Sequence, residues 1–464
     1  MRKALFIAVG CLVAAAASCN SRKKTLPPLD RFYFPSGIHH HRAGPTGEGF
    51  LYVVSANTDR RYDTGVMTAV DLDTVGLPEF GADDAGSTPV QILDLNIDVD
   101  ASVVQLANFG ADLGVAPISG GVRMFIPSRA EGQKLMVVDA HGTRLDCVPT
   151  IIVEDGGSRV GTDPRDCGEV GASLVELERI GNGVPRADSP MMATVSPDAG
   201  TVWVSSGRHA DAPRFSMMNY NDYIVRLPLW RSEGVKLTIG DFQGIGPGST
   251  HAVAVGQRWA YFSGRFPGNG IVNPPLLRLV DEQSARVVDP FLQAQVTVSD
   301  ARGIALSSDE RRLFLVGRQP SGATGNDFLV IASITGALTD NPIISPLDPV
   351  PLPTEPQMVK TIARPGRRDL VVIVCSGAGS LALYDDESGI VKNVDGIGVQ
   401  PSSFAIDRRG AGARIYVTNF QDGRVAVVDI PDLLSPQDAR IVAHLGATQV
   451  CITRRDFQCD AGLP

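Results

Sequence analysis

The sequence lacks the signatures of most familiar catalytic sites. It has no Gly-x-Ser-x-Gly nucleophile elbow and no recognisable Ser/His/Asp set. Its glycine-rich segment at 244–249 is interrupted by Pro247, and no helix is expected after it, so it matches neither a dinucleotide fingerprint nor a P-loop. There is no double Cys-x-x-Cys motif for zinc and no Cys-x-x-Cys-His for haem. These absences argue against the commonest enzyme classes.

The chain is also poor in basic charge and in long apolar runs. Its 42 Lys and Arg residues are outnumbered by 51 Asp and Glu, and no basic stripe is present, so nucleic-acid binding is not expected. After the N-terminal segment no run reaches about 18 apolar residues, so no transmembrane helix is expected. Glycine (49) and proline (32) are abundant in the 464 residues, which favours short strands and turns over long helices.

The N-terminus is typical of an export signal. Arg2 and Lys3 precede an apolar run over 4–17, which is too short to span a bilayer comfortably. The run ends in the letters AASC, and small residues before a cysteine resemble the lipobox of bacterial lipoproteins. Leucine is usual where Ala16 stands, so the match is imperfect.

This resemblance implies a signal peptide over 1–18, lipid attachment at Cys19 and a polar tether over 19–30. We therefore expect a cell-envelope protein held to a membrane by its lipid, on the periplasmic or the cell-surface side. The alternative is a plain secretory signal cut near Ser18.

Five cysteines follow the lipid-attachment position. Cys147 and Cys167 flank a polar, glycine-rich stretch, and Cys451 and Cys459 lie close together at the C-terminus. Both pairs are predicted to form local disulfides, which persist in an oxidising compartment, although five reduced thiols are the alternative. Cys375 lies in an aliphatic run and is expected to be a buried free thiol.

Internal repetition is the main structural signal. Four short stretches rich in β-branched residues, separated by turn residues, follow one another at 402–407, 414–419, 424–429 and 439–443. Four antiparallel strands in a meander make one propeller blade. The unit resembles the YVTN repeat family of seven-bladed propellers, and residues 416–419 spell the motif.

Weaker copies of the second strand of this unit recur along the chain. They lie at 51–57, 124–128, 202–206, 260–263, 313–316 and 370–374. With the copy at Tyr416 they make seven, so we expect an all-β chain whose residues 31–464 form a seven-bladed β-propeller, with six or eight blades as the alternatives. Third strands that end in Asp also recur, at Asp71, Asp139, Asp281, Asp385 and Asp429.

The spacing of the copies varies from 44 to 78 residues, more than a regular propeller requires. The surplus is expected in loops, within 74–115, 144–188, 207–222 and 264–275, and insertions in a repeat array tend to fall on one face, often the binding face. Residues 446–452 resemble the opening of an inner strand. They are predicted to close the ring beside the N-terminal blade, with the Cys451–Cys459 bridge pinning that closure.

Few side chains are candidates for a site. In a strand, His39 and His41 of the triplet 39–41 share one face and could bind a transition metal; a partly solvated strand edge is the alternative. His251 aligns with Met192, Gly303, Met358 and Ser403 of other repeats, where inner strands line the central channel. It is expected to be either a functional channel residue or a hydrogen-bonded structural histidine.

Residues 94–100 alternate acidic or amide side chains with aliphatic ones. An EF-hand loop requires Gly at its sixth position and an acid at its twelfth, but Val99 and Gln105 stand there. The segment is therefore interpreted as an edge strand with an acidic outer face. Calcium binding elsewhere in the inserted loops stays open, and no other cofactor is expected.

These observations favour a non-enzymatic binding or scaffold propeller on the cell envelope, with an unidentified protein or small-molecule ligand. The alternative is a propeller enzyme of the lactone-hydrolase type, which uses polar and acidic residues around the channel. Because the resemblance covers only scaffold strands, it assigns no catalytic residue. Three or more convergent Asp, Glu or His side chains at the channel mouth would favour the enzyme.

Overall fold

The computed structural model describes two long parts of the chain and shorter pieces between them. Described are 25–148 (except 30, 45–46, 83–89, 96, 99 and 130–133), short segments from 150 to 288 that are mostly strands, 300–318, 327–446, 450–451 and 459–460. The predicted signal peptide, Cys19 and most of the predicted tether lie outside the described residues. Within the described part, no helix is long and apolar enough to cross a membrane.

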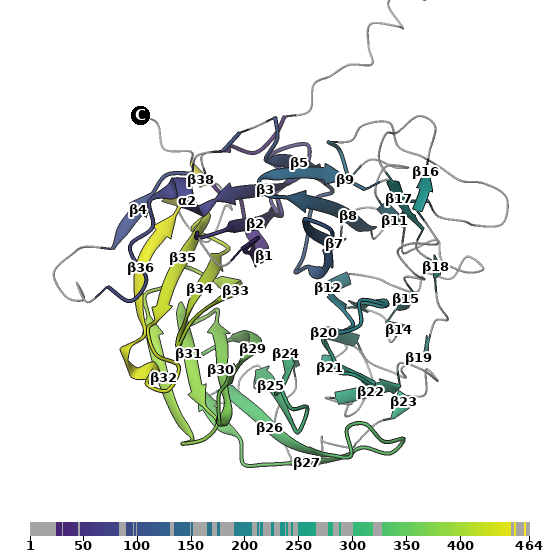
Figure 1. Ribbon diagram of the computed structural model, residues 1–464, viewed down its shortest axis with the longest axis vertical. Coiled ribbons are helices and arrows are strands. Elements are labelled where there is room, and N and C mark those ends of the chain that lie inside the picture. The colour runs from purple at the N-terminus through teal and green to yellow at the C-terminus, as the bar shows by residue number, and fades with distance from the viewer. Residues whose placement is uncertain are drawn as a thin grey trace, which may run out of the picture.

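The described strands pair into antiparallel groups that follow one another along the chain and surround a central axis (Figure 1). This is a β-propeller, and each group is a blade. Blade 1 consists of β1 (Pro35–His41), β2 (Phe50–Ser55), β3 (Gly65–Asp71) and β5 (Val103–Leu106). Blade 2 consists of β6 (Gly114–Ile118), β7 (Gly121–Ser128), β8 (Lys134–His141), β9 (Arg144–Cys147) and β11 (Leu174–Glu176).

The middle of the chain supplies three further blades. Blade 3 consists of β12 (Pro190–Val195), β13 (Thr201–Ser206), β15 (Arg214–Ser216) and β18 (Thr238–Ile239). Blade 4 consists of β20 (Ser249–Val255), β21 (Trp259–Arg265), β22 (Leu277–Asp281) and β23 (Val287–Val288). Blade 5 consists of β24 (Asp300–Leu306), β25 (Arg312–Arg318), β26 (Asp327–Thr335), β27 (Ile343–Pro346) and β28 (Val350–Leu352).

The C-terminal part is the most regular. Blade 6 consists of β29 (Pro356–Arg364), β30 (Arg367–Cys375), β31 (Ser380–Asp385) and β32 (Ile390–Asp395). Blade 7 consists of β33 (Pro401–Arg409), β34 (Gly412–Asn419), β35 (Arg424–Ile430), the 3-10 turn η3 (Pro436–Asp438) and β36 (Arg440–Leu445). Short strands outside the blades are β10 (Thr150–Ile151), β14 (Asp211–Ala212), β16 (Ile224–Arg226), β17 (Glu233–Lys236) and β19 (Gln243–Gly244). One pair between β21 and β24, Arg265 with Asp300, joins blades 4 and 5 into a nine-stranded sheet. Counted as two blades, they bring the number of groups to seven, and the predicted blade number stays a prediction.

The repeated second-strand motif forms the core of the blades. Its copies fall in β2, β7, β13, β21, β25, β30 and β34. In each of these strands one large side chain is completely buried: Tyr52, Phe125, Trp203, Phe262, Phe314, Val372 and Tyr416. A single blade cannot cover both faces of its sheet, so these residues are buried only because neighbouring blades stack on either side.

The recurring Asp at the end of the third strand has a structural role in four blades. It pairs with an arginine of the same blade: Asp139 with Arg123 at 2.6 Å, Asp281 with Arg258 at 3.1 Å, Asp429 with Arg414 at 2.6 Å, and Asp385 with Arg364. In blade 1, Asp71 instead caps the helix α2 (Leu72–Val75), accepting the Asp73 N–H at 3.0 Å. In these four blades the carboxylate therefore holds the third strand to an arginine that precedes it in the same blade.

The ring closes where blade 7 meets blade 1. An insertion from blade 1 carries β4 (Gln91–Leu93), which adds to blade 7 as a parallel neighbour of β36, and Leu93 O accepts the Gly446 N–H at 2.9 Å. Phe32 packs into the cluster that joins the two blades, and its N–H donates to Gly423 O at 3.2 Å. In Figure 1, β4 and α2 lie beside β36 at this seam.

The insertion also covers a group of charges that we call the seam cluster: Arg409, Arg414, Asp407, Asp429 and Glu48. Arg414 and Asp429 have no exposed side-chain surface, and the Arg414 guanidinium also donates to Glu48 at 3.0 Å and to Pro78 O at 2.8 Å. The Phe80 ring lies against both guanidiniums, 5.4 Å from that of Arg409 and 5.8 Å from that of Arg414.

The edge strand expected at 94–100 was wrong, since β4 ends at Leu93 and no described residue of 94–100 is in a strand. The segment predicted to close the ring is described at Gly446, which bonds to Leu93, and in β37 (Val450–Cys451), which pairs with β38 (Cys459–Asp460). The role of the Cys451–Cys459 bridge in the closure stays a prediction, and the described closure uses β4. A short parallel strand inside a long insertion gives no periodic sequence signal, which is why it was missed.

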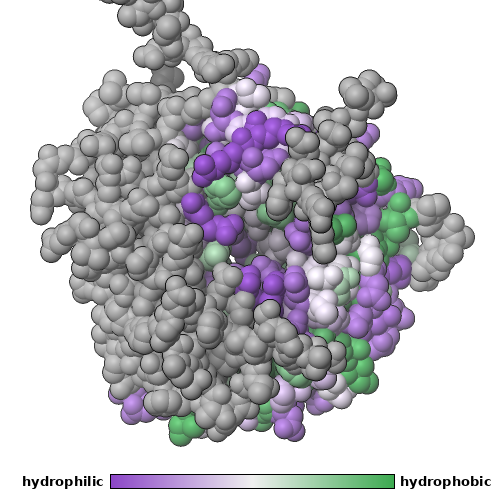
Figure 2. Space-filling model, turned by 180° about the vertical axis from the view of Figure 1, so that it is seen from behind, coloured by the Kyte–Doolittle hydropathy of each residue, from purple (hydrophilic) through white to green (hydrophobic). Residues whose placement is uncertain are grey.

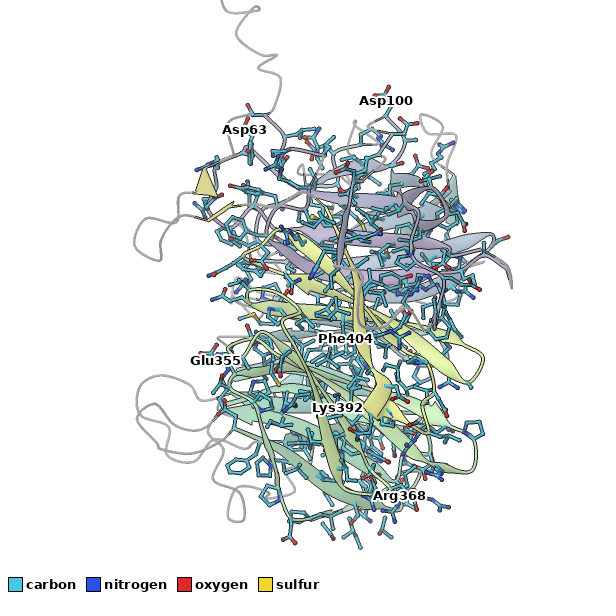
Figure 3. All side chains as sticks on the ribbon, turned by 90° about the vertical axis from the view of Figure 1, so that its left-hand side faces the viewer. Asp63, Asp100, Glu355, Arg368, Lys392 and Phe404 are labelled. Atoms are coloured by element: carbon cyan, nitrogen blue, oxygen red, sulfur yellow. A yellow bond between two sulfur atoms is a disulfide. The ribbon has the colours of Figure 1, made fainter. Side chains whose placement is uncertain are left out.

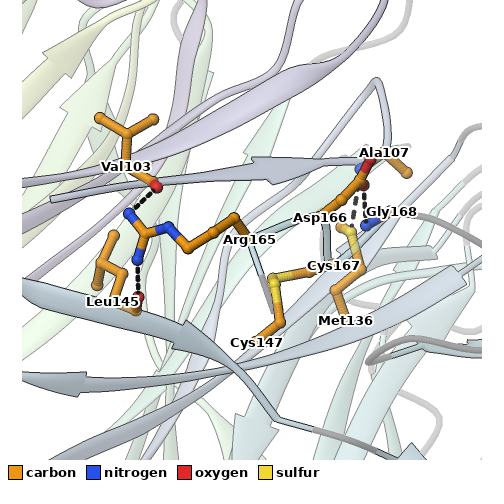
Figure 4. The surroundings of a disulfide bond; sticks show 9 residues. All are labelled: Val103, Ala107, Met136, Leu145, Cys147, Arg165, Asp166, Cys167 and Gly168. Carbon is orange, nitrogen blue, oxygen red and sulfur yellow. Dashed lines mark hydrogen bonds between the residues drawn. A yellow bond between two sulfur atoms is a disulfide. The ribbon is translucent and has the colours of Figure 1, made fainter. Parts of the chain in front are cut away.

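Cys147 and Cys167 form a disulfide, 20 residues apart (Figure 4). It fixes a short segment against blades 1 and 2: the Arg165 guanidinium donates to Val103 O and Leu145 O, and the Cys167 N–H donates to Gln105 O at 2.9 Å. The side chains of Cys451 and Cys459 lie outside the described residues. Cys375 is a buried free thiol whose pKa burial raises to about 12.

Candidate functional site

A cavity of about 360 Å³ lies at the end of the central channel where the inner strands begin. Each of the seven blades contributes a residue at, or just before, the start of its first strand. These residues are Ser36, Asp112, Met192, His251, Arg302, Gln357 and Ser402. Glu355, which also lines the cavity, lies at one face of the propeller, and Arg368 lies toward the opposite face (Figure 3). Seen from the face opposite to that of Figure 1, the described residues around a central hollow are mostly hydrophilic (Figure 2).

A repeated β-bulge turns these residues toward the channel. Six inner strands shift register near their start, between Pro35 and Gly37, Pro190 and Ala193, Thr250 and Val253, Ala301 and Gly303, Pro356 and Met358, and Pro401 and Ser403. The residues skipped by the pairing include Ser36, Arg302, Gln357 and Ser402, all of which line the cavity. A bulge leaves a residue outside the ladder and re-aims its side chain, so the fold itself presents these groups to the cavity.

Glycines allow the inner strands to approach closely below the cavity. A Cβ on Gly37 would lie 2.7 Å from Ala111 O, and one on Gly303 would lie 3.0 Å from the Met358 Cα. No side chain fits at such distances, so neighbouring blades meet by their backbones here. This narrows the channel and gives the cavity a floor.

Three arginines line the cavity although the whole chain is acidic. Arg318 donates to Gln357 Oε1 at 2.8 Å and lies 3.5 Å from Glu355. Arg302 is a bulge residue of β24. Arg129 is exposed at the rim just after β7, the protein around it lowers the pKa of its guanidinium, and no carboxylate of the described residues forms an ion pair with it. The mouth is therefore suited to an anionic group.

The floor of the cavity carries a buried carboxylate, Asp112. Its Oδ1 accepts the Ser403 hydroxyl at 2.9 Å, whereas its Oδ2 has no hydrogen-bond partner. Burial raises the pKa of Asp112, whereas the charge of Lys360 and hydrogen bonds from the Ser403 hydroxyl and from the Leu113 and Ile38 backbones lower it. Burial lowers the pKa of Lys360. The Lys360 ammonium donates to Phe404 O and lies 5.0 Å from the Phe404 ring. Opposite charges thus face each other inside the channel.

His251 lines the cavity together with Met192, Gly303 and Met358 from the positions aligned with it; at the fourth aligned position Ser402 lines the cavity and Ser403 lies just below. The His251 Nδ1 donates to Arg302 O at 2.7 Å, and its own carbonyl accepts the Ser205 hydroxyl at 2.6 Å. His251 thus ties blade 4 to blades 3 and 5 while facing the cavity.

The histidine triplet lies in β1. His39 stacks on Tyr52 with ring centroids 6.4 Å apart, and burial lowers the pKa of His39 to about 3. The His40 ring contacts two polar groups. Its Nε2 lies 2.8 Å from the backbone carbonyl of Glu48, and its Nδ1 lies 3.7 Å from the Asp407 carboxylate. His39 and His41 bring no third ligand with them, since no three His, Cys, Asp or Glu of the described residues cluster in a way that could hold a metal ion.

Asp112, Arg129 and Lys360 were missed by sequence reasoning. Asp112 lies in the stretch 74–115, which was assigned to a loop because the spacing between the repeat copies on either side is long. Arg129 and Lys360 differ from their counterparts in other blades, so repetition gives no signal for them. β1 begins with Pro-x-Gly and β33 with Pro-x-Ser. These starts coincide with the bulges and are the sequence signal that could have indicated the cavity-lining positions.

No family model and no curated protein matches the sequence. Among solved structures, hydrazine synthase of Kuenenia stuttgartiensis aligns with a TM-score of 0.53 at 12% identity, over 89% of this chain and 98% of that one. The periplasmic gluconolactonase of Pseudomonas aeruginosa aligns with a TM-score of 0.48 at 14% identity, over 89% and 94% of the two chains. Apo AztD from Citrobacter koseri aligns with a TM-score of 0.41 at 14% identity, over 82% and 80%. The first likeness shows a shared β-propeller fold, and at this identity it shows nothing further.

Proposed function

We propose that this chain is an envelope-anchored binding propeller that holds a small molecule in the cavity at the channel mouth. The observation that carries the proposal is the convergence of bulged inner strands on one cavity. A concave site with a few convergent polar groups is the usual form of a small-molecule site, and repeated bulges are an arrangement that packing alone does not require.

The polar groups support binding more than catalysis. Asp112, His251 and Glu355 all line the cavity, which meets the count set for an enzyme. They do not act on a common point, however: His251 is bonded to Arg302 O, Glu355 lies beside Arg318, and Asp112 is bonded to Ser403. A nucleophile with its base and an oxyanion-stabilising pair is not evident among these contacts.

Hydrolysis of a sugar lactone is the second candidate. It is favoured by Asp112, whose raised pKa and partner-free Oδ2 suit a general base, and the gluconolactonase neighbour acts on a compound of this class by its name. Glucono-δ-lactone hydrolysis by the purified protein, and its loss in Asp112→Asn, would replace binding by this enzymatic function.

A thermal-shift screen of small metabolites against the purified mature protein tests the binding proposal. Met191→Trp fills the cavity from a bulge without removing a polar contact, and Ile390→Trp adds the same bulk at a position on β32 that is 54% exposed. A compound that raises the Tm of the wild type and of Ile390→Trp, but not of Met191→Trp, supports the site. If no compound binds, or if Met191→Trp binds equally well, the proposal is wrong.

The anchor is proposed from the resemblance of residues 16–19 to a lipobox. Acyl chains at Cys19 would hold the propeller at a membrane surface through the tether. Cys19→Ala should move the protein from the membrane fraction to the soluble fraction, and an unchanged membrane fraction would contradict lipidation. Affinity capture from detergent-solubilised envelopes, compared between wild type and Met191→Trp, would reveal a protein partner that docks at the same mouth.

A further inference from the structure

The cavity presents two charged groups that the described residues leave short of partners. Asp112 is 7% exposed, and its Oδ2 has no donor. A buried carboxylate oxygen without a hydrogen bond is unfavourable relative to one that is satisfied. Arg129 stands at the rim without a described carboxylate to pair with. Asp112 Oδ2 can therefore accept a hydrogen bond from a ligand, and the Arg129 guanidinium can donate one.

Strand pairing fixes the separation of the two groups. Gly110 pairs with Ser128 in an antiparallel bridge, and the Arg129 N–H donates to Phe109 O at 3.2 Å. Arg129 therefore lies opposite Phe109, and Asp112 follows three residues later on the same edge of blade 2. Three residues of chain span at most about 10 Å, and Phe109 bends the backbone with φ 58°, so the two positions are no farther apart than that along the chain. A ligand that contacts both groups is therefore a small molecule.

We propose that the ligand is a small organic acid that also carries a hydrogen-bond donor, a hydroxyl or an ammonium group. Its carboxylate pairs with the Arg129 guanidinium at the mouth, and its donor bonds to Asp112 Oδ2 at the floor. The inference deepens the proposed function and rests on it. It explains why an acidic chain gathers arginines at one cavity and why Asp112 keeps one oxygen without a partner.

Three matched probes test the ligand class. Succinate, L-malate and L-aspartate share a four-carbon dicarboxylate skeleton and differ in carrying no donor, a hydroxyl or an ammonium group. In isothermal titration of the mature protein, malate and aspartate are expected to bind about tenfold more tightly than succinate, the effect of one hydrogen bond to a charged group. Equal binding of all three probes overturns the role of Asp112 without need of any variant.

Variants separate the two contacts. In Asp112→Asn the Ser403 hydroxyl holds the amide oxygen, so the amide N–H₂ faces the ligand donor and the advantage of malate and aspartate over succinate should disappear. Arg129→Gln should weaken all three probes by a similar factor. Arg144→Gln is the control, because Arg144 is exposed and its described partner is Asp146. A loss of binding in the control, or none in Arg129→Gln, overturns the proposal.

The outcomes distinguish the ligand class from the proposed function. If none of the three probes binds, while the metabolite screen yields a compound that Met191→Trp excludes, the ligand class is wrong and the binding site stands. If compounds bind equally to wild type and Met191→Trp, the site itself is wrong.

Discussion

Charged side chains are paired differently at the two ends of the inner strands. Where the inner strands end, Arg409 and Arg414 are bonded to Asp407, Asp429 and Glu48 and covered by Phe80. Against the effect of burial, the two arginines lower the pKa of Glu48. Where the strands begin, Asp112 keeps an oxygen without a donor. The difference shows two uses of buried charge. Charges that are fully paired stabilise the closed ring at one end, and a carboxylate oxygen without a hydrogen-bond donor is available to a ligand at the other.

The largest effect is expected at the seam cluster. Arg414→Met leaves Asp429 buried without its partner, and we expect the free energy of unfolding to fall by about 3–5 kcal/mol. Urea denaturation followed by circular dichroism measures it. The double variant Arg414→Met with Asp429→Leu should recover most of the loss, since an apolar pair leaves no lone charge. A single variant within 1 kcal/mol of wild type would break the comparison.

Removing the disulfide gives a second change in the free energy of unfolding, with which the effect of Arg414→Met can be compared. Replacing Cys147 and Cys167 by serine opens a loop with a sequence separation of 20, which should lower the free energy of unfolding by about 3 kcal/mol. The loss should vanish when wild type and variant are compared under reducing conditions. A persistent difference there would show that the serines act through packing.

Removing the cover of the seam cluster should cost less. Phe80→Ala takes an aromatic ring from two guanidiniums while their ion pairs remain, so we expect a loss of about 1–2 kcal/mol. Thermal unfolding at low and high salt measures it, with Leu434→Ala as an exposed control. Phe80→Leu should retain the packing and lose only the cation–π part, which separates the two contributions.

The stability of the fold should depend on pH through two neighbouring carboxylates, Asp386 and Asp385. Burial raises the pKa of Asp386 to about 6, although Arg312 opposes this. Between about pH 6 and 4 the folded state keeps a proton that the unfolded chain loses, so this group adds stability as the pH falls from 7 to 5. Asp386→Asn should abolish that gain, of the order of 1–2 kcal/mol, in unfolding experiments at the two pH values.

Asp385, the preceding residue, has the opposite effect on stability as the pH falls. Burial is outweighed by hydrogen bonds from Arg364, Glu387 and Ser388, which hold its pKa at about 2. Its contribution to stability is complete above about pH 4 and is lost as the pH falls toward 2. Unfolding experiments at pH 4 and below should therefore show a loss in wild type that Asp385→Asn lacks.

The smallest effect on stability is expected at the cavity. Asp112→Asn keeps the bond to Ser403 but removes the charge that faces Lys360, with which Asp112 forms no close ion pair, so the free energy of unfolding should fall by about 1 kcal/mol, less than in Arg414→Met. The same unfolding assay measures it beside Arg414→Met. A loss as large as that of Arg414→Met would show that Asp112 is a structural group, and the contrast between the two ends would fail.

The sequence predicted the parts that repeat. Tyr52, Trp203 and Tyr416 stand in second strands because each blade must bury one face against the next, and periodicity reveals that requirement. The recurring Asp was visible as well, but its arginine partners come from the first strand, the second strand or the turn between them, so the sequence alone does not pair them. The parts that occur once, Asp112 and β4, have no second copy to compare with. The site and the seam were therefore beyond repeat analysis.

The seam has a consequence for how the molecule is made. Residues 77–93 leave the ribosome early, yet their docking partners Arg409, Arg414 and β36 are synthesised more than 300 residues later. Until then the insertion has nothing to dock on, and blade 1 keeps one face uncovered. Synthesis delivers the chain from its N-terminus, so the ring is completed only when its last blade arrives. Any chaperone that protects this protein would be needed for the first blade rather than the last.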